Sequence, residues 1–231
     1  MRITFLGTSA GWPLPRLGCK CEICKSRDPR DKRTRSQILI DREILLDAGP
    51  ETYQHLLREN PTKIKTVIIT HKHHDHIAGL WDLAKIYNRK KPLVIIKSKG
   101  KLEKFKINSF NITLFPVIHS KSVPTCGVLI EKNGRKAVYA PDFREIPNAS
   151  LKLLKSVDIL IIGGSSLGIK GRALGHETIE EGIVLGKKLA AKKVYFIHIG
   201  HSTGKHEDLE KFVKIKGANF HIPHDNLTLD L

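Results

Sequence analysis

The 231-residue sequence predicts an α/β fold in four layers, in which two mixed β-sheets pack together and helices cover their outer faces. Short β-branched runs, bounded by Gly, Pro, Asn and Asp, recur along the whole chain and are typical of strands. The early runs fall in pairs, as in QILI-DR-EILLD at 37–47, whereas the later runs alternate with segments of helical periodicity. Paired strands followed by alternating strands and helices indicate mixed sheets.

Each expected element is a short run of one periodicity. Strands are expected at 2–6, 37–40, 43–47, 66–70, 93–97, 112–117, 126–131, 136–140, 158–164, 193–198 and 227–231. Helices are expected at 51–59, 77–88, 150–156, 177–192 and 205–216. Residues 97–110 are the most loop-like segment, but they are too short to divide the chain. We therefore expect one domain over residues 1–231.

Composition excludes several classes of protein. No apolar run approaches the roughly 20 residues of a membrane span, and the amino terminus lacks a signal-peptide pattern. Four cysteines, three of them clustered, favour metal binding in a reducing compartment, so we expect a cytoplasmic protein without a membrane partner. The net charge of +17 favours anionic partners, with nucleic acid among them. A solvated surface on a thermophile protein is the other interpretation, supported by the single Met.

The strongest chemical signal is THKHHDH, directly after the strand at 66–70. Alternate residues of an extended segment point the same way, so His71 and His73 can bind one metal ion together. The chain then turns and directs Asp75 and His76 towards a neighbouring point. This spacing predicts ligands for two ions at the carboxyl end of a strand, where α/β folds commonly place chemistry. A solvated polar turn would not need so many histidines against apolar flanks.

Three further candidates follow apolar strands: His119 in FPVIHSK, Asp142 in AVYAPDF and His198 in KVYFIHIGH. A single histidine at a strand end is usually a hydrogen-bonded structural residue. Residues that all follow strands can instead converge on the same rim of the sheets. Imidazole and carboxylate ligands suit zinc, and equally manganese or iron.

THKHHDH resembles the T-H-x-H-x-D-H signature of the metallo-β-lactamase superfamily. The resemblance implies an αββα sandwich and assigns His71, His73 and His119 to one metal ion, Asp75, His76 and His198 to the other, and Asp142 to a bridge. It also implies two divalent ions, zinc or manganese, that hold a bridging hydroxide for attack on phosphorus, with Asp75 among the catalytic residues.

Other motifs indicate branches of this superfamily. LGTSAGWP is similar to the opening turn of its phosphodiesterase and tRNA 3′-end-processing branches, and ILLDAGP resembles its strand that ends in Asp-x-Gly. These likenesses imply that Asp47 orients a ligand imidazole. They also imply that His176, in GHETIEEG before a helix, is a catalytic residue that binds no metal. Weaker candidates for substrate contacts are Ser120, Lys121, Arg33, Arg35 and Asp225.

Cys19, Cys21 and Cys24 form a C-x-C-x-x-C cluster, and HIGH supplies a second histidine, His201. The combination resembles the phosphoribosyl cyclic phosphate phosphodiesterase branch of phosphonate degradation. It implies a structural zinc ion held by the three thiolates and His201. Cys126 fits a small buried hydrophobe. The remaining histidines include two on expected helices, at 55 and 206, which we expect at the surface.

Three functions are weighed. The first is a dinuclear metal-dependent phosphodiesterase whose partner is a small cyclic or diester ribose phosphate. The second is a metal-dependent ribonuclease of the tRNA 3′-end processing type; the charge favours it, but only 33 residues separate Asp142 from His176, which leaves no long tRNA-binding arm. The third is a non-hydrolytic metal-binding accessory protein, which the full set of ligands opposes. The sequence leaves open whether the protein forms a homodimer.

Overall fold

The computed structural model describes residues 1–59, 64–86, 93–168 and 175–231. Its strands are β1 (Arg2–Gly7), β2 (Gln37–Ile40), β3 (Ile44–Leu46), β4 (Thr66–Ile69), β5 (Val94–Lys97), β6 (Glu103–Ile107), β7 (Phe110–Val117), β8 (Thr125–Lys132), β9 (Arg135–Ala140), β10 (Ile159–Gly163), β11 (Lys193–Ile197), β12 (Phe220–His221) and β13 (Thr228–Asp230). Its helices are α1 (Glu22–Lys25), η1 (Pro29–Asp31), α2 (Thr52–Glu59), α3 (His74–Ile77), α4 (Leu80–Ile86), α5 (Asn148–Leu151), η2 (Lys152–Leu154), α6 (Ile179–Lys188) and α7 (His206–Lys216).

The strands form two mixed sheets. One has six strands in the order β13-β1-β2-β3-β4-β5, and the other has seven in the order β12-β11-β10-β9-β8-β7-β6. In each sheet the β-meander part is antiparallel, and the strands joined through helices are parallel. Parallel neighbours need a crossover connection, which the helices supply. The predicted fold class is confirmed.

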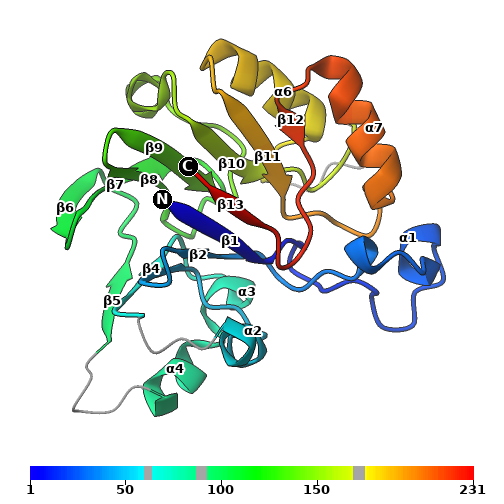
Figure 1. Cartoon of the computed structure of the whole chain (residues 1–231), viewed down its shortest axis with the longest axis horizontal. Coiled ribbons are helices and arrows are strands. Elements are labelled where there is room, and N and C mark those ends of the chain that lie inside the picture. The colour runs from blue at the N-terminus through cyan, green and yellow to red at the C-terminus, as the bar shows by residue number, and fades with distance from the viewer. Residues whose placement is uncertain (60–63, 87–92, 169–174) are drawn as a thin grey trace.

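The layers follow from three apolar clusters. One lies between the sheets and joins side chains such as Phe5 and Ile38 to Val128 and Ile161. A second joins the six-stranded sheet to Leu56 of α2 and to α4. The third places α5, α6 and α7 on the outer face of the seven-stranded sheet. Figure 1 shows this order of helix, sheet, sheet and helix, with β1 and β13 side by side at the chain ends.

The first predicted pair of strands forms a tight hairpin between β2 and β3. Asp41 and Arg42 both have positive φ, 47° and 60°, and the Glu43 N–H donates to the Ile40 carbonyl over 2.9 Å. Positive φ at both central residues is the geometry of a type I′ turn, whose twist matches that of the flanking strands. The pairing read from the sequence is therefore confirmed.

Two local expectations were wrong. The loop-like segment 97–110 contains β6, which forms the edge of the larger sheet, with Phe105 packed against the inter-sheet cluster. An edge strand with one buried face needs only alternate apolar residues, and lysines between them hide it. The expected helix 77–88 is divided into α3 and α4 at Gly79, where a Cβ would lie 2.3 Å from the Gly49 carbonyl oxygen. Residues 87–88 lie outside the described ranges.

Short elements with little sequence signal were missed, namely α1, η1 and the two-residue strand β12. The histidines expected at the surface are also buried. His55 Nε2 lies 2.7 Å from the Thr34 hydroxyl, and the backbone N–H of His206 donates to Asp31 over 2.7 Å. Their partners come from the segment before β2, which the sequence pattern could not place.

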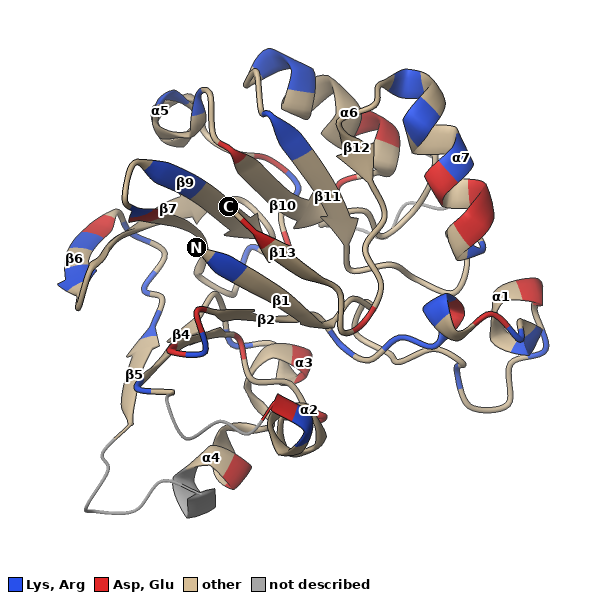
Figure 2. Ribbon diagram, in the orientation of Figure 1, with Lys and Arg blue, Asp and Glu red and all other residues tan. Residues whose placement is uncertain are grey.

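Basic residues are spread over several elements. Figure 2 shows Lys and Arg on α6, α7, β6 and β9, with acidic side chains among them on both helices and on β6. Surface pairs such as Lys211 with Glu207 are exposed and one helical turn apart. Within the described ranges, no helix is long and apolar enough to cross a membrane.

Candidate dinuclear metal centre

The predicted ligands gather where strands of both sheets end. His71 and His73 follow β4 of the smaller sheet, with Asp75 and His76 in α3 immediately after them. The larger sheet contributes His119 after β7, Asp142 after β9 and His198 after β11. The centre is therefore built from the carboxyl ends of four strands, and its geometry depends on how the two sheets pack.

The first ligand group consists of His71, His73, His119 and Asp142, whose ligand atoms all lie within 4.8 Å of one another. His73 Nδ1 lies 2.9 Å from His71 Nε2 and 3.2 Å from His119 Nε2. Three imidazole nitrogens that face one another in this way suit a shared metal ion.

The second group consists of Asp75, His76, Asp142 and His198, again within 4.8 Å. His76 Nε2 lies 3.2 Å from an Asp75 oxygen, and His198 Nδ1 lies 3.1 Å from Asp142 Oδ1. Asp142 belongs to both groups. Its Oδ2 lies 3.5 Å from the Nε2 atoms of His71 and His76, so this one carboxylate faces both clusters.

Three buried atoms of the centre make no hydrogen bond within the described part of the chain: His76 Nε2, Asp142 Oδ1 and His198 Nδ1. Their neighbours are close but do not have hydrogen-bond geometry. A buried polar atom without a partner costs roughly 1–3 kcal/mol. Because these three point into the two clusters, the residues fit a pair of divalent cations.

The opposite ring nitrogens are held by fixed partners. Thr70 Oγ1 lies 3.0 Å from His71 Nδ1, and His119 Nδ1 lies 2.7 Å from the Gly175 carbonyl oxygen, to which it can donate. His76 Nδ1 lies 2.7 Å from Asp47 Oδ2. Partners of this kind orient the rings, and donation from Nδ1 leaves Nε2 free to bind a metal ion.

Asp47 holds several parts of the centre together. Besides His76, its carboxylate accepts hydrogen bonds from the Thr70 backbone N–H at 2.8 Å, the Thr70 hydroxyl at 2.9 Å and the Tyr139 hydroxyl at 2.9 Å. The structure therefore places Asp47 against a ligand imidazole. The sequence pattern did not suggest Tyr139 at all, and Thr70 was visible only as the first letter of THKHHDH.

The electrostatics of the centre favour metal binding. Burial lowers the pKa of His71 and of His73, which keeps both imidazoles neutral with a free lone pair. Burial opposes ionisation of Asp142, but the adjacent His198 and His76 lower the pKa of this carboxyl well below its ordinary value. The centre thus offers neutral imidazoles at His71 and His73 beside an ionised carboxylate. At His76 burial opposes protonation, but Asp47 and Asp142 raise the pKa of this imidazole well above its ordinary value.

His176 lies beside the centre without belonging to either group. Its ring stacks on His198 with centroids 5.1 Å apart and meets His119 edge-on at 4.8 Å. It precedes α6, whose amino terminus carries a capping box of Thr178 and Glu181. His176 and His198 line a cavity of about 220 Å³ that is open to solvent.

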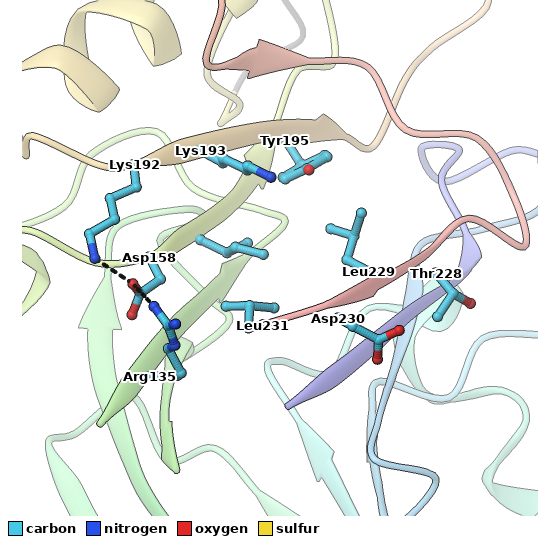
Figure 3. A pocket seen from close by; sticks show the side chains of 10 residues that line it. Arg135, Asp158, Lys192, Lys193, Tyr195, Thr228, Leu229, Asp230 and Leu231 are labelled. Atoms are coloured by element: carbon cyan, nitrogen blue, oxygen red, sulfur yellow. Dashed lines mark hydrogen bonds and ion pairs between the residues drawn. The ribbon is translucent and has the colours of Figure 1, made fainter. Parts of the chain in front are cut away.

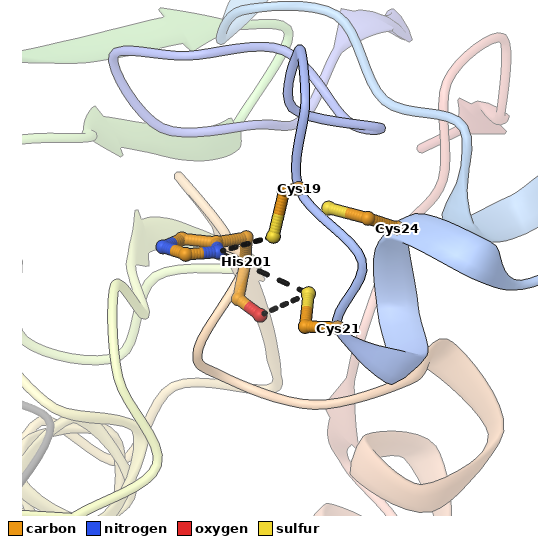
Figure 4. Close-up of side chains that lie close together, drawn as sticks. All are labelled: Cys19, Cys21, Cys24 and His201. Atoms are coloured by element: carbon orange, nitrogen blue, oxygen red, sulfur yellow. Dashed lines mark hydrogen bonds between the residues drawn. The ribbon is translucent and has the colours of Figure 1, made fainter.

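The cysteine cluster lies against the next histidine. Figure 4 shows Cys19, Cys21 and Cys24 around His201, with Cys21 just before α1. Cys19 Sγ lies 3.5 Å and Cys21 Sγ 3.9 Å from His201 Nδ1, and all four ligand atoms lie within 4.8 Å of one another. Hydrogen bonds from Cys21 and His201 lower the pKa of Cys19 to about 6, which favours the thiolate that zinc binds. Cys126, as expected, is buried elsewhere.

The weaker candidates belong to neither ligand group. Ser120 bonds to Ser122 in an exposed loop, Lys121 is exposed, and Asp225 accepts hydrogen bonds from Thr8 and Thr34 behind the opening turn. The expectation of a cationic contact from Arg33 was wrong, because this side chain is buried and donates to Thr8 and to the Pro223 carbonyl. Arg35 is paired with Glu51 and donates to the Gly11 carbonyl, and a substrate contact from it stays a prediction.

A larger cavity, of about 450 Å³, lies at the other end of the parallel strands and contains none of the candidate ligands. Figure 3 shows Asp158 there between Lys192 and Arg135. Leu229 of β13 and the next apolar residue, Leu231, also line this cavity.

Comparison with known families shows to which family the chain belongs. Residues 42–199, from the β2–β3 turn to just beyond His198, match the family model described as the Beta-lactamase superfamily domain. The chain belongs to this superfamily. Its members are, in general, metal-dependent hydrolases, and their fold binds metal ions. The signature resemblance of THKHHDH is thereby confirmed at the level of the family.

Two curated relatives show how diverse the family is. An octanoyltransferase from Porphyromonas gingivalis is 26% identical over 98% of this chain, which spans only about half (51%) of that protein. Coenzyme PQQ synthesis protein B from Methylobacterium radiotolerans is also 26% identical, and the match covers all of both chains. Neither name by itself decides what this chain does.

Solved structures are similar over nearly the whole chain. A new diphosphatase from the PhnP family has a TM-score of 0.87 and 28% identity, covering 99% of this chain and 97% of its own. Zinc-bound PqqB from Methylobacterium extorquens has a TM-score of 0.83 with 22% identity over both full chains. The short form of human tRNase Z has a TM-score of 0.72 with 18% identity, covering 100% of this chain and 99% of its own. The last two show the shared fold.

Proposed function

We propose that this protein is a dinuclear metal-dependent phosphodiesterase acting on a small cyclic or diester ribose phosphate. One observation carries the proposal: the buried carboxylate of Asp142 faces both ligand groups, each of which contains two residues of the THKHHDH signature. Two ions bridged in this way suit phosphoester chemistry. The likeness to a diphosphatase of the PhnP family supports the same chemistry.

Two divalent ions at the centre, zinc or manganese, would activate a water molecule and neutralise charge on the phosphoryl oxygens. The protein supplies the remaining functions. Asp75, half-buried beside His76, is placed to accept a proton from the attacking water. His176, on the wall of the cavity, is placed to donate a proton to the leaving oxygen.

The cavity favours a small substrate. At about 220 Å³ it is smaller than the 300–1,000 Å³ of typical ligand sites, and it is open to solvent, so a small phosphoester fits inside and a larger substrate would extend over its rim. The tRNA-processing alternative shares the fold of human tRNase Z and is consistent with the net charge of +17. It lacks support from the spacing, since 33 residues between Asp142 and His176 leave no room for a long arm.

A role in cofactor biosynthesis is the second candidate, because the match to coenzyme PQQ synthesis protein B covers both chains completely. The intact ligand set of this chain favours hydrolysis. An assay of phosphodiester hydrolysis with added zinc or manganese separates the two candidates, since an accessory protein would show no turnover.

The decisive experiment compares three substrates with the wild type and with His176→Ala. We expect hydrolysis of a cyclic ribose phosphate and of an aryl phosphodiester to exceed that of precursor tRNA. His176→Ala should slow hydrolysis by about 10²–10⁴-fold, the range for removal of a general acid, without changing the metal content. His221→Ala, in which a histidine on β12 is removed, is the matched control. Precursor tRNA as the sole good substrate would overturn the proposal.

A further inference from the structure

One aromatic side chain stands at the mouth of the metal centre. Trp12 is 62% exposed, and it lines the same cavity as His176 and His198. Single exposed apolar residues are common on protein surfaces. An indole in the same cavity as two histidines of the candidate centre is different, because a phosphoester bound in this cavity would lie close to its ring.

The backbone under this indole is held on both sides. The Ser9 hydroxyl contacts the Trp12 carbonyl at 2.7 Å and the Ile199 carbonyl at 3.1 Å. Beyond the ring, Leu14 and Arg33 exchange two backbone hydrogen bonds of 2.7 and 3.0 Å. Trp12 is therefore an exposed ring on a fixed support, which lowers the entropy cost of packing a ligand against it.

A guanidinium lies next to the ring. The Cζ atom of Arg16 is 5.3 Å from the Trp12 ring centroid, and its Nη1 is 3.3 Å from His201 Nε2. Among the described residues that line the cavity, Arg16 is the one Lys or Arg. An anionic group held away from the two ligand clusters would thus meet this side chain, and guanidinium binds phosphate through two parallel hydrogen bonds.

We propose that Trp12 and Arg16 form a subsite for a nucleotide, in which a base stacks on the indole and a phosphate that is not cleaved pairs with the guanidinium. This inference rests on the proposed function and names its substrate class, a nucleotide ester that carries a second phosphate besides the phosphoester that is cleaved. Base stacking on an aromatic ring does not depend on the identity of the base, so the subsite selects nucleotides over esters without a base.

Binding can be tested without turnover, because the chain contains two tryptophans. In a zinc-loaded Trp81→Phe variant, Trp12 is the sole tryptophan, and it can be excited selectively over the four tyrosines. Adenosine 5′-monophosphate should quench its emission, ribose 5-phosphate should not, and adenosine should bind about tenfold or more weakly because it lacks the phosphate. Arg16→Ala should remove the preference for the phosphate. Equal responses to the nucleotide and to ribose 5-phosphate would overturn the subsite.

Kinetics test the same residues independently. Trp12→Ala should lower kcat/KM on a 2′,3′-cyclic nucleotide by about tenfold to a hundredfold, the range for loss of one stacked base, through KM. Activity on a cyclic ribose phosphate without a base should stay unchanged, and Trp12→Phe should restore most of the loss. If Trp12→Ala changed kcat/KM equally for the esters with and without a base, the subsite would be overturned and the proposed function would stand. Nucleotide binding with no hydrolysis of either ester would overturn the proposed function and leave the subsite standing.

Discussion

At the scale of single residues, Asp47 shows how one side chain can set the tautomer of a ligand. Its carboxylate accepts from His76 Nδ1 and from the Tyr139 hydroxyl through the same oxygen. In Asp47→Asn, the amide NH₂ can turn towards His76, where it would face the N–H donor at Nδ1. This clash of two donors favours the tautomer that carries its hydrogen on Nε2, the atom that would bind the metal ion. Asn also tolerates the positive φ of 62° at this position.

We therefore expect Asp47→Asn to weaken binding at the second ligand group by about 10–100-fold without unfolding the protein. Competition with a chelator, followed by elemental analysis, measures the loss. Asp41→Asn is the matched control, because this acid also has positive φ and accepts from a backbone N–H, but lies at the hairpin turn. Equal metal affinity in both variants would refute the orienting role of Asp47.

The buried side chain of His55 predicts how the stability of the protein depends on pH. Burial lowers its pKa to about 3, whereas the unfolded chain titrates near 6.5. Below pH 6.5 the unfolded state therefore binds a proton that the folded state excludes, and stability falls as the pH drops towards 3. At about 1.4 kcal/mol per pH unit, His55 should account for about 2 kcal/mol of the stability lost between pH 7.5 and 5.0.

The measurement is guanidinium unfolding at both pH values. His55→Gln should lose about 2 kcal/mol less than the wild type on acidification. His74→Gln, which changes an exposed histidine, should lose as much as the wild type. An identical pH dependence in all three proteins would show that His55 is not the neutral buried group described.

Arg33 and His55 also show where sequence reasoning ends at this scale. Ligands could be predicted because their chemistry demands residue types at fixed spacings after strands, as in THKHHDH. The burial of Arg33 could not be predicted from the sequence, because its partners come from distant parts of the chain. They are Thr8, Pro223 and His206. A charged side chain is exposed unless the fold supplies such partners, and a local pattern does not record them.

At the scale of elements, the cysteine segment depends on its metal site more than on packing. The cluster around α1 contains only Leu14, Ile23 and Cys24 as buried apolar residues. So small a core stabilises little by itself, and small units of this kind commonly rely on zinc. This segment also positions Trp12 and Arg16, so its order bears on the cavity.

Cys24→Ser should thus remove about one zinc ion per chain and open the segment around α1. We expect faster tryptic cleavage at Lys20 and Lys25, read by mass spectrometry, and lower zinc content by elemental analysis. Cys126→Ala removes the one cysteine outside the cluster and should leave both readings as in the wild type. Unchanged zinc content in Cys24→Ser would contradict a structural zinc site here.

Element prediction depended on apolar runs in the sequence. Continuous apolar runs such as ILIIG of β10 are buried along their whole length and were expected. In contrast, β6 alternates EKFKI at a sheet edge, and α1 is a single turn next to the cysteines. Such elements exist because neighbouring segments hold them, so their own residues carry little signal.

At the scale of the whole molecule, the centre joins the two halves of the sandwich. His71, His73, Asp75 and His76 come from the smaller sheet and its helix, whereas His119, Asp142 and His198 come from the larger one. Metal ions bound between them would bind the folded state and not the unfolded chain. Binding of this kind raises stability by mass action.

Asp142 faces both ligand groups, so one substitution tests the whole arrangement. The wild type should hold about two ions at the centre and one in the cysteine cluster, about three in all. In Asp142→Asn the neutral amide replaces the shared carboxylate, and we expect both central ions to be lost while about one zinc ion remains. The melting temperature, measured by calorimetry with and without chelator, should then depend less on the metals. Asp158→Asn, in the distant cavity, is the matched control. If Asp142→Asn kept about three ions, Asp142 would not bridge the two groups.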